Sequence, residues 1–211
     1  MSKKVTIACF SDNHGKIVKN IPNADIVIAC GDVTYDGTRW SLDKFLGWFS
    51  ELPHKEKIFI AGNHDFCLQN DICKAMIPKN VVYLQDTLYK SKTGLKIYGS
   101  PYVPKFFDWC FMKERGEEIS EVWKKIPKGL DILVTHGPAS GELDENKRGV
   151  QCGCYDLGRY INIKKPKVHL FGHIHHSRGM KKLGDTLSVN CSILDDDYDY
   201  VYKPYLIEVE K

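Results

Sequence analysis

The sequence predicts an α/β fold in which two mixed β-sheets pack face to face as a sandwich flanked by helices. Apolar, β-branched runs recur along the whole chain, and helical patterns separate the early runs, as in β-α-β units. The later runs are joined by shorter connections, which favours a second sheet packed on the first. With 211 residues, 43% of them hydrophobic and 27% charged, the chain fits one globular domain, residues 1–211.

The elements are read from residue periodicity. The helix expected at Ser41–Glu51 is the clearest, because its apolar residues fall on one face and Ser41 is a suitable N-cap. Shorter helices are expected at Asn70–Met76 and Glu117–Lys125. The expected strands are Val5–Phe10, Asp25–Ala29, Lys57–Ala61, Val81–Leu84, Leu95–Tyr98, Asp131–Thr135, Val168–Phe171, Thr186–Val189 and Tyr205–Val209.

Composition makes several classes of function less favoured. A net charge of +3 and a pI near 8.3 are too mild to predict a nucleic-acid interface. The chain has no long apolar signal region and no apolar stretch of about 20 residues, so we expect a cytoplasmic protein without membrane contact. Eight cysteines without paired C-x-x-C spacing favour free, buried thiols. For Cys152-Gly153-Cys154, an incidental loop pair is favoured over a soft-metal or redox pair.

Five short blocks of metal-binding residue types follow apolar runs, at the strand ends where α/β sheets build their sites. Alone, each block has an ordinary structural interpretation, such as a helix cap for Asp12 or a core histidine for His136. All five in this order predict a metal centre instead. The blocks are Asp12-Asn13-His14, Gly31-Asp32, Gly62-Asn63-His64-Asp65, His136-Gly137 and Gly172-His173-Ile174-His175.

These blocks supply enough ligands for two divalent ions. Mixed carboxylate and imidazole donors favour Mn, Fe or Zn over Ca. Ligands two residues apart, such as Asp12 and His14, point to the same side of an extended chain. Asp32, after the second strand, is the natural bridging carboxylate. The expected ligands are Asp12, His14, Asp32, Asn63, His136, His173 and His175.

The ordered motifs Asp-x-His, Gly-Asp, Gly-Asn-His-Asp, His and Gly-His-x-His closely resemble those of the calcineurin-like metallophosphoesterase superfamily. A narrower likeness, in Ile58–His64, Tyr83–Asp86, Ile97–Pro101 and Asp131–Pro138, resembles the brain-type metallophosphoesterase-domain proteins and their microbial relatives, a phosphodiesterase-type branch. Some members of that branch replace the first histidine of Gly-His-x-His by glycine. This chain keeps His173, so the resemblance implies a complete dinuclear centre.

The resemblance also implies roles for these residues. It implies that His64 contacts the phosphate and aids departure of the leaving group, while Asp65 orients the His64 ring. It further implies hydrolysis by a metal-bridging hydroxide, with Mn as the first expectation and Fe or Zn as alternatives. One ion is assigned to Asp12, His14, Asp32 and His175, and the other to Asp32, Asn63, His136 and His173.

The leading expectation is a phosphodiesterase that hydrolyses small phosphodiesters such as cyclic nucleotides. A phosphomonoesterase or protein phosphatase of the same fold is the first alternative, because substrate choice resides in loops. A non-catalytic scaffold that binds protein partners is the second, since some members of the superfamily act in that way. The presence of the full ligand set and of His64 argues against the scaffold.

The segment Pro101–Phe111 concentrates aromatic residues in a proline-broken stretch, so it is a candidate wall for the site. An ordinary hydrophobic cluster under a loop is an equally good interpretation. Lys147, Arg148 and Arg178 are candidates for a phosphate contact, although surface charge is favoured for each. The acidic run Asp195–Asp199 is expected to be a solvated loop. The aromatic candidates are Tyr102, Phe106, Phe107 and Trp109.

Overall fold

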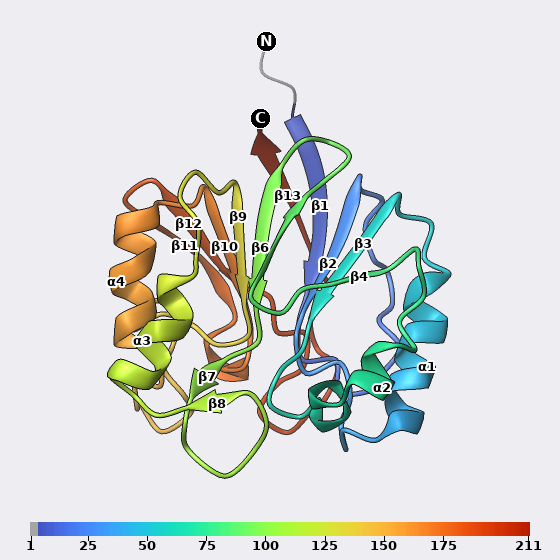
Figure 1. The fold of residues 1–211 in the computed structure, drawn as a ribbon, viewed down its shortest axis with the longest axis horizontal. Coiled ribbons are helices and arrows are strands. Elements are labelled where there is room, and N and C mark those ends of the chain that lie inside the picture. Colours follow the sequence, from blue (N-terminus) through green and yellow to red (C-terminus); the bar gives the residue numbers. More distant parts are fainter. Residues whose placement is uncertain (1–3) are drawn as a thin grey trace.

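Two large sheets packed face to face form the centre of the computed structural model, which describes residues 4–211 (Figure 1). The predicted α/β sandwich is confirmed. The first sheet has the strand order β13-β1-β2-β3-β4, and only β13 runs antiparallel to its neighbour. Its strands are β1 (Lys4–Phe10), β2 (Ile26–Cys30), β3 (Glu56–Ile60), β4 (Val82–Tyr83) and β13 (Tyr205–Glu210).

The second sheet has the order β11-β12-β10-β9-β6-β5, with four parallel strands between two antiparallel edge strands. A separate short pair, β7 (Val103–Pro104) and β8 (Met112–Lys113), lies in the aromatic segment. The strands of the second sheet are β5 (Thr87–Lys90), β6 (Lys96–Ser100), β9 (Ile132–Thr135), β10 (Val168–Phe171), β11 (Gly179–Leu183) and β12 (Thr186–Asn190).

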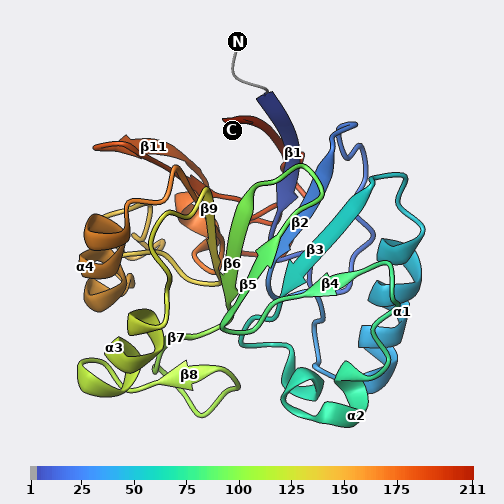
Figure 2. The ribbon, with the colours of Figure 1, turned by 45° about the horizontal axis from the view of Figure 1, so that its top comes forward.

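Helices cover the outer faces of the sandwich (Figures 1 and 2). The first sheet carries α1 (Arg39–Ser50) and α2 (Asp71–Lys74), and the second carries α3 (Glu117–Lys124) and α4 (Tyr155–Lys164). Two short 3₁₀ helices are η1 (Phe66–Gln69) and η2 (His175–Ser177). The N-cap of α1 is Thr38 rather than the predicted Ser41, because the Thr38 side chain accepts the Ser41 backbone N–H.

Alternation along the strands divides the core into layers. In β1, Ile7 and Cys9 face the second sheet, whereas Ala8 and Phe10 face α1. The layer between the sheets is built mainly from isoleucine, valine and leucine, and an aromatic cluster that includes Phe49 packs α1 onto its sheet. A third cluster packs α3 and α4 onto the second sheet. Burial on both faces explains why the central strands read as continuous apolar runs.

Helix α4 and strands β5 and β11 were not predicted from the sequence. In α4 only Leu157 and Ile161 are buried, and Gly158 interrupts the helical pattern. Strands β5 and β11 are edge strands whose residues are mostly exposed, so they lack an apolar signature. All eight cysteines are free, as predicted. No helix among residues 4–211 is long and apolar enough to cross a membrane.

Candidate metal centre

The carboxyl ends of the parallel strands in both sheets meet at one edge of the sandwich, the lower edge in Figure 1. The five sequence blocks follow β1, β2, β3, β9 and β10 at this edge. Their side chains form groups of ligand atoms within 4.8 Å of one another. The structure therefore brings together six of the expected ligands in these groups: Asp12, His14, Asp32, His136, His173 and His175. Asn63 joins them through its Oδ1, which lies 3.0 Å from His136 Nε2.

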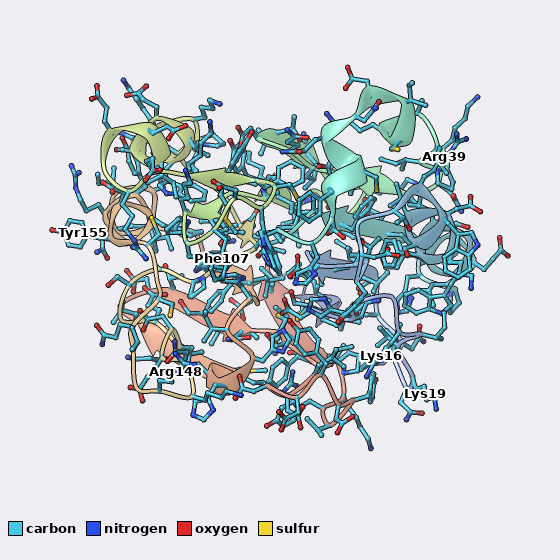
Figure 3. All side chains as sticks on the ribbon, turned by 90° about the horizontal axis from the view of Figure 1, so that it is seen from below. Lys16, Lys19, Arg39, Phe107, Arg148 and Tyr155 are labelled. Carbon is cyan, nitrogen blue, oxygen red and sulfur yellow. The ribbon has the colours of Figure 1, made fainter. Side chains whose placement is uncertain are left out.

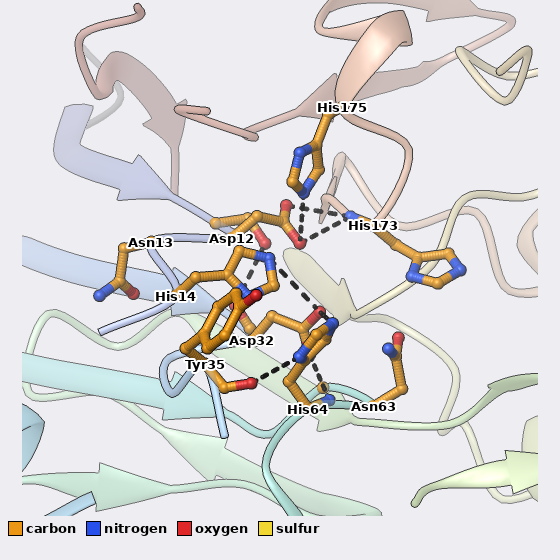
Figure 4. A network of polar contacts seen from close by, with 12 residues as sticks. Asp12, Asn13, His14, Asp32, Tyr35, Asn63, His64, His173 and His175 are labelled. Carbon is orange, nitrogen blue, oxygen red and sulfur yellow. Dashed lines mark hydrogen bonds and ion pairs between the residues drawn. The ribbon is translucent and has the colours of Figure 1, made fainter. Parts of the chain in front are cut away.

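Asp32 lies at the centre of the cluster (Figure 4). Its Oδ2 is 3.3 Å from His136 Nε2, 3.8 Å from His14 Nε2 and 4.0 Å from His64 Nε2. The same carboxylate belongs to two of the ligand groups, which is the arrangement that a bridging ligand requires. Its other oxygen, Oδ1, accepts the backbone N–H of His64 at 2.8 Å.

Asp12 anchors the other end of the cluster. Its Oδ1 lies 3.7 Å from His175 Nε2, and its carboxylate accepts the His173 backbone N–H at 3.0 and 3.1 Å. Ser192, which follows β12, donates its hydroxyl to Asp12 Oδ2 at 2.7 Å. These bonds fix the carboxylate from two different strands of the second sheet, so its orientation does not depend on a bound ion.

The donor set fits divalent ions. Both ring nitrogens of His14 are buried and have no hydrogen-bond partner among the described residues. A buried imidazole without a partner is costly, and a metal ion satisfies one of its nitrogens. The remaining donors are carboxylate and amide oxygens and imidazole nitrogens, the mixture that Mn, Fe and Zn accept.

Ligand residues in this cluster have an unusual backbone conformation. Asp12, His14, Asp32 and His173 have φ values of 57°, 42°, 49° and 69°, in the left-handed region that non-glycine residues seldom adopt. Such strain persists only where the surrounding structure imposes it, and it is typical of functional sites. Glycine at position 62 leaves space for the Asp32 carboxylate, because a Cβ on Gly62 would collide with Asp32 Oδ1.

Charge within the metal-free cluster is shared between carboxylates and histidines. Burial lowers the pKa of His14 to about 4 and, together with the neighbouring His136, lowers the pKa of His173 to about 3. For His136, burial acts in the same direction, but Asp32 outweighs it and raises the pKa to about 9. Asp12 likewise overcomes burial and raises the pKa of His175 to about 9. Two imidazolium protons must therefore leave when ions bind at neutral pH.

His64 and Asp65 have different surroundings from each other. His64 Nδ1 donates to the backbone carbonyl of Tyr35 at 2.8 Å, which leaves Nε2 facing Asp32 (Figure 4). The expectation that Asp65 orients this ring is wrong. The Asp65 carboxylate instead accepts bonds from the N–H groups of Val33, Thr34 and Gly62 and from the Thr34 hydroxyl, at 2.7 to 3.2 Å. Asp65 therefore joins the loops after β2 and β3 to each other.

A pocket of about 500 Å³ opens over the cluster. Of the four aromatic candidates, Phe106 and Trp109 line it, and the Trp109 ring lies edge-on to His64 with centroids 4.6 Å apart. Phe107 is 62% exposed near the centre of the face in Figure 3, outside the lining. Tyr102 packs on Phe111 instead. The aromatic segment is thus partly a wall and partly a hydrophobic cluster.

The basic side chains of the pocket are not the ones considered from the sequence. Arg178 donates to the carbonyls of Ser192 and Lys203 and stacks on Tyr205, so it is structural. Lys147 and Arg148 do not line the pocket. Among the described residues, Arg115 is the one Lys or Arg side chain in the lining. Arg115 precedes α3 and belongs to no sequence motif, so it was not considered from the sequence.

The acidic run is a loop in which Asp197, Tyr198 and Asp199 are exposed, as expected, but it also contacts the cluster of expected ligands. The backbone carbonyl of Asp195 accepts a bond from His175 Nδ1 at 2.8 Å, so this loop orients an expected metal ligand. Tyr198 lines the pocket beside it.

Outside the cluster, the Cys152 thiol faces Asn146, while Cys154 caps α4 by accepting the Leu157 N–H. These two thiols therefore have separate structural partners.

Comparison with known proteins agrees with this geometry. A family model described as calcineurin-like phosphoesterase matches residues 5–177. Metallophosphoesterase domain-containing protein 1 of Homo sapiens is 34% identical over 228 residues, covering 95% of this chain and 70% of that protein. A UPF0046 protein of Caenorhabditis elegans is 34% identical over 230 residues, covering 98% and 81%.

Solved structures share the fold at low identity. Phosphopantetheinyl hydrolase from Mycobacterium tuberculosis superposes with a TM-score of 0.59 at 16% identity, covering 99% of this chain and 97% of its own. The protein TT1561 of Thermus thermophilus superposes with a TM-score of 0.60 at 15% identity, covering 89% of each chain. With the family match over most of the chain, these findings establish that the protein belongs to the calcineurin-like phosphoesterase family of metal-dependent phosphoesterases.

Proposed function

We propose that this protein is a phosphodiesterase with a dinuclear metal centre, acting on small phosphodiesters such as cyclic nucleotides. The observation that carries the proposal is the character of the pocket around the cluster. Phe106 and Trp109 give it an apolar wall, and Arg115, the one Lys or Arg that residues 4–211 contribute to the lining, is already bonded to the carbonyls of Cys152 and Gly153. A diester presents one negative charge and a second organic group, and this lining suits both better than it suits a doubly charged monoester.

The residues of this chain supply the other parts of the chemistry. The seven ligands would hold two divalent ions, with Mn as our first choice, which supply hydroxide near neutral pH and neutralise phosphoryl charge. His64 points Nε2 toward the pocket because its Nδ1 donates to the Tyr35 carbonyl. In its imidazolium form, with protons on both ring nitrogens, His64 would deliver the Nε2 proton to the departing ester oxygen and keep the Nδ1 proton on the Tyr35 carbonyl. A base of a nucleotide would stack on Trp109.

The test is hydrolysis of bis-p-nitrophenyl phosphate and p-nitrophenyl phosphate, measured side by side with metal-stripped protein supplied with Mn, Zn or Mg. We expect turnover restored by metal, with the diester preferred. Asp32→Ala is the control variant, because removal of the shared carboxylate takes a ligand from two of the ligand groups and should abolish metal binding and turnover together.

The alternatives give different results in the same assay. Preference for the monoester would contradict the proposal and indicate a phosphatase. Binding of metal without turnover of either ester would indicate a protein-binding scaffold that has kept its ligands. If the diester is preferred, comparison of 2′,3′- and 3′,5′-cyclic nucleotides then identifies the substrate class.

A further inference from the structure

Tyr198 sits in a loop whose conformation is imposed by its neighbours. Asp195 Oδ1 accepts the N–H groups of Asp197 and Asp199 at 3.0 and 2.8 Å, and the Asp195 carbonyl accepts the Tyr198 N–H at 3.0 Å. Within this turn Tyr198 has a φ of 64°, in the left-handed region that bulky non-glycine residues seldom adopt. The loop therefore holds the Tyr198 side chain in a defined position although this strains the backbone.

Both the backbone and the ring of Tyr198 are held by neighbouring residues. Lys16 Nζ donates to the Tyr198 carbonyl. The Tyr198 ring packs edge-on against His14, with centroids 4.8 Å apart, and against His175 at 5.3 Å. Both histidines belong to the ligand group with Asp12. The ring is thus held against the two imidazoles expected to bind one ion.

The Tyr198 hydroxyl has no partner in the part of the chain that the structure describes. Among residues 4–211 no hydrogen bond to this hydroxyl is formed, although Tyr198 lines the pocket and is 37% exposed. A phenol carries one donor proton at neutral pH, and a phosphoryl oxygen is a strong acceptor. A fixed ring with a free donor at the pocket surface is what a contact to substrate requires.

The order of the rings shows which part of the substrate Tyr198 meets. Trp109 packs on His64, His64 lies 4.5 Å from His14 between ring centroids, and His14 packs on Tyr198. Trp109 therefore contacts the His64 end of the His64–His14 pair, and Tyr198 contacts the His14 end. If His64 serves the leaving group beside Trp109, a phosphoryl oxygen beside His14 and Tyr198 is one that is retained.

From this geometry, and resting on the proposed function, we infer that Tyr198 binds substrate by donating its phenolic O–H to a retained oxygen of the phosphoryl group. It is a substrate contact contributed by the loop before β13, outside the five metal-binding blocks. A neutral donor at this place adds a bond to the phosphoryl group without adding positive charge, which suits the single charge of a diester.

The experiment compares Tyr198→Phe with wild type, because this change removes the hydroxyl and keeps the ring that packs on His14 and His175. Tyr155→Phe is the matched control, since Tyr155 is 69% exposed on α4 and lies at the far edge of the face in Figure 3. Two quantities are measured on Mn-loaded protein: affinity for inorganic phosphate by calorimetry, and kcat/KM for bis-p-nitrophenyl phosphate. Bound Mn is quantified in each sample.

We expect Tyr198→Phe to lose about tenfold or more in both quantities, with Mn content unchanged and Tyr155→Phe equal to wild type. Values within about twofold of wild type would overturn the inference, and so would loss of Mn, which would make Tyr198 a support for the metal ligands. If wild type binds phosphate but hydrolyses no diester, the proposed function fails while the phosphate measurement still decides the role of Tyr198. If wild type binds no phosphate, the inference fails as well.

Discussion

The floor and the walls of the pocket are built in different ways. The floor is the set of seven expected ligands, which lie at the ends of buried strands and are held by hydrogen bonds between both sheets. The walls are the loop residues of the lining in segments 106–109 and 146–152 and at Tyr198, and many of them are exposed. A rigid floor suits chemistry shared by a family, whereas walls on loops are free to select a substrate. Variants in the two regions should therefore fail differently.

The largest effect is expected from His64→Ala, at the boundary between floor and wall. We expect kcat for a diester to fall about 10²- to 10⁴-fold, because a positioned proton donor contributes that much. Bound Mn should stay at the wild-type level, as measured by elemental analysis. His176→Ala, half-exposed and outside the pocket lining, is the control. Loss of metal in His64→Ala would place His64 among the ligands, as its position in the group with His14 and Asp32 allows.

The sequence predicts the floor well because its signals are local. Each ligand block follows an apolar run, so the strand and the ligand at its end are encoded together. The left-handed backbone at Asp12 and Asp32 was not foreseen, since tertiary contacts impose it. The role of Asp65 was not foreseen for the same reason, because its partners Val33 and Thr34 come from a loop that follows a different strand.

The walls were predicted less completely because no short motif encodes them. Proline and aromatic content indicated the segment around Trp109, but only the fold separates Trp109, which lines the pocket, from Tyr102, which does not. Tyr198 lies in an acidic run whose composition is typical of a solvated loop. Its role depends on which histidines its ring contacts, and one of these, His14, lies near the opposite end of the chain.

The stability of the floor is tested by Asp65→Ala. The change leaves three buried backbone N–H groups without an acceptor, those of Val33, Thr34 and Gly62. We expect the free energy of unfolding to fall by about 3 kcal/mol, measured by denaturant titration of the metal-free protein. Asp43→Ala, at an exposed position of α1, should change it by about 0.5 kcal/mol or less. Equal effects of the two changes would show that Asp65 does not join the loops.

Metal loading should depend on pH. In the metal-free protein the pKa of both His136 and His175 is about 9, since Asp32 and Asp12 outweigh burial. Each ion must displace one of these protons, so its apparent affinity should fall about tenfold for each pH unit below about 9. Titration of stripped protein with Mn at pH 6.5, 7.5 and 8.5 measures this slope. An affinity independent of pH would show that the histidines are neutral before metal binds.

The raised pKa values of His136 and His175 predict that the stability of the metal-free protein and that of the Mn-loaded protein change in opposite directions as pH rises. Their pKa in the folded, metal-free state lies above the unfolded value of about 6.5, so their contribution is complete below pH 6.5 and is lost as pH rises through 9. Metal-free protein should therefore lose stability over this range, while protein in excess Mn should gain it. Thermal unfolding at matched pH values, with and without Mn, separates the two curves.

The smallest effect is expected from Trp109→Ala in the wall. Loss of a stacking surface should raise KM for bis-p-nitrophenyl phosphate about tenfold, with a smaller change for methyl p-nitrophenyl phosphate. Phe107→Ala is the matched control, because Phe107 is exposed and does not line the pocket. The Trp109 ring also contacts His64. A fall in kcat at constant KM would therefore contradict the prediction. It would mean that this wall residue positions the floor, and that the two regions are less independent than their construction indicates.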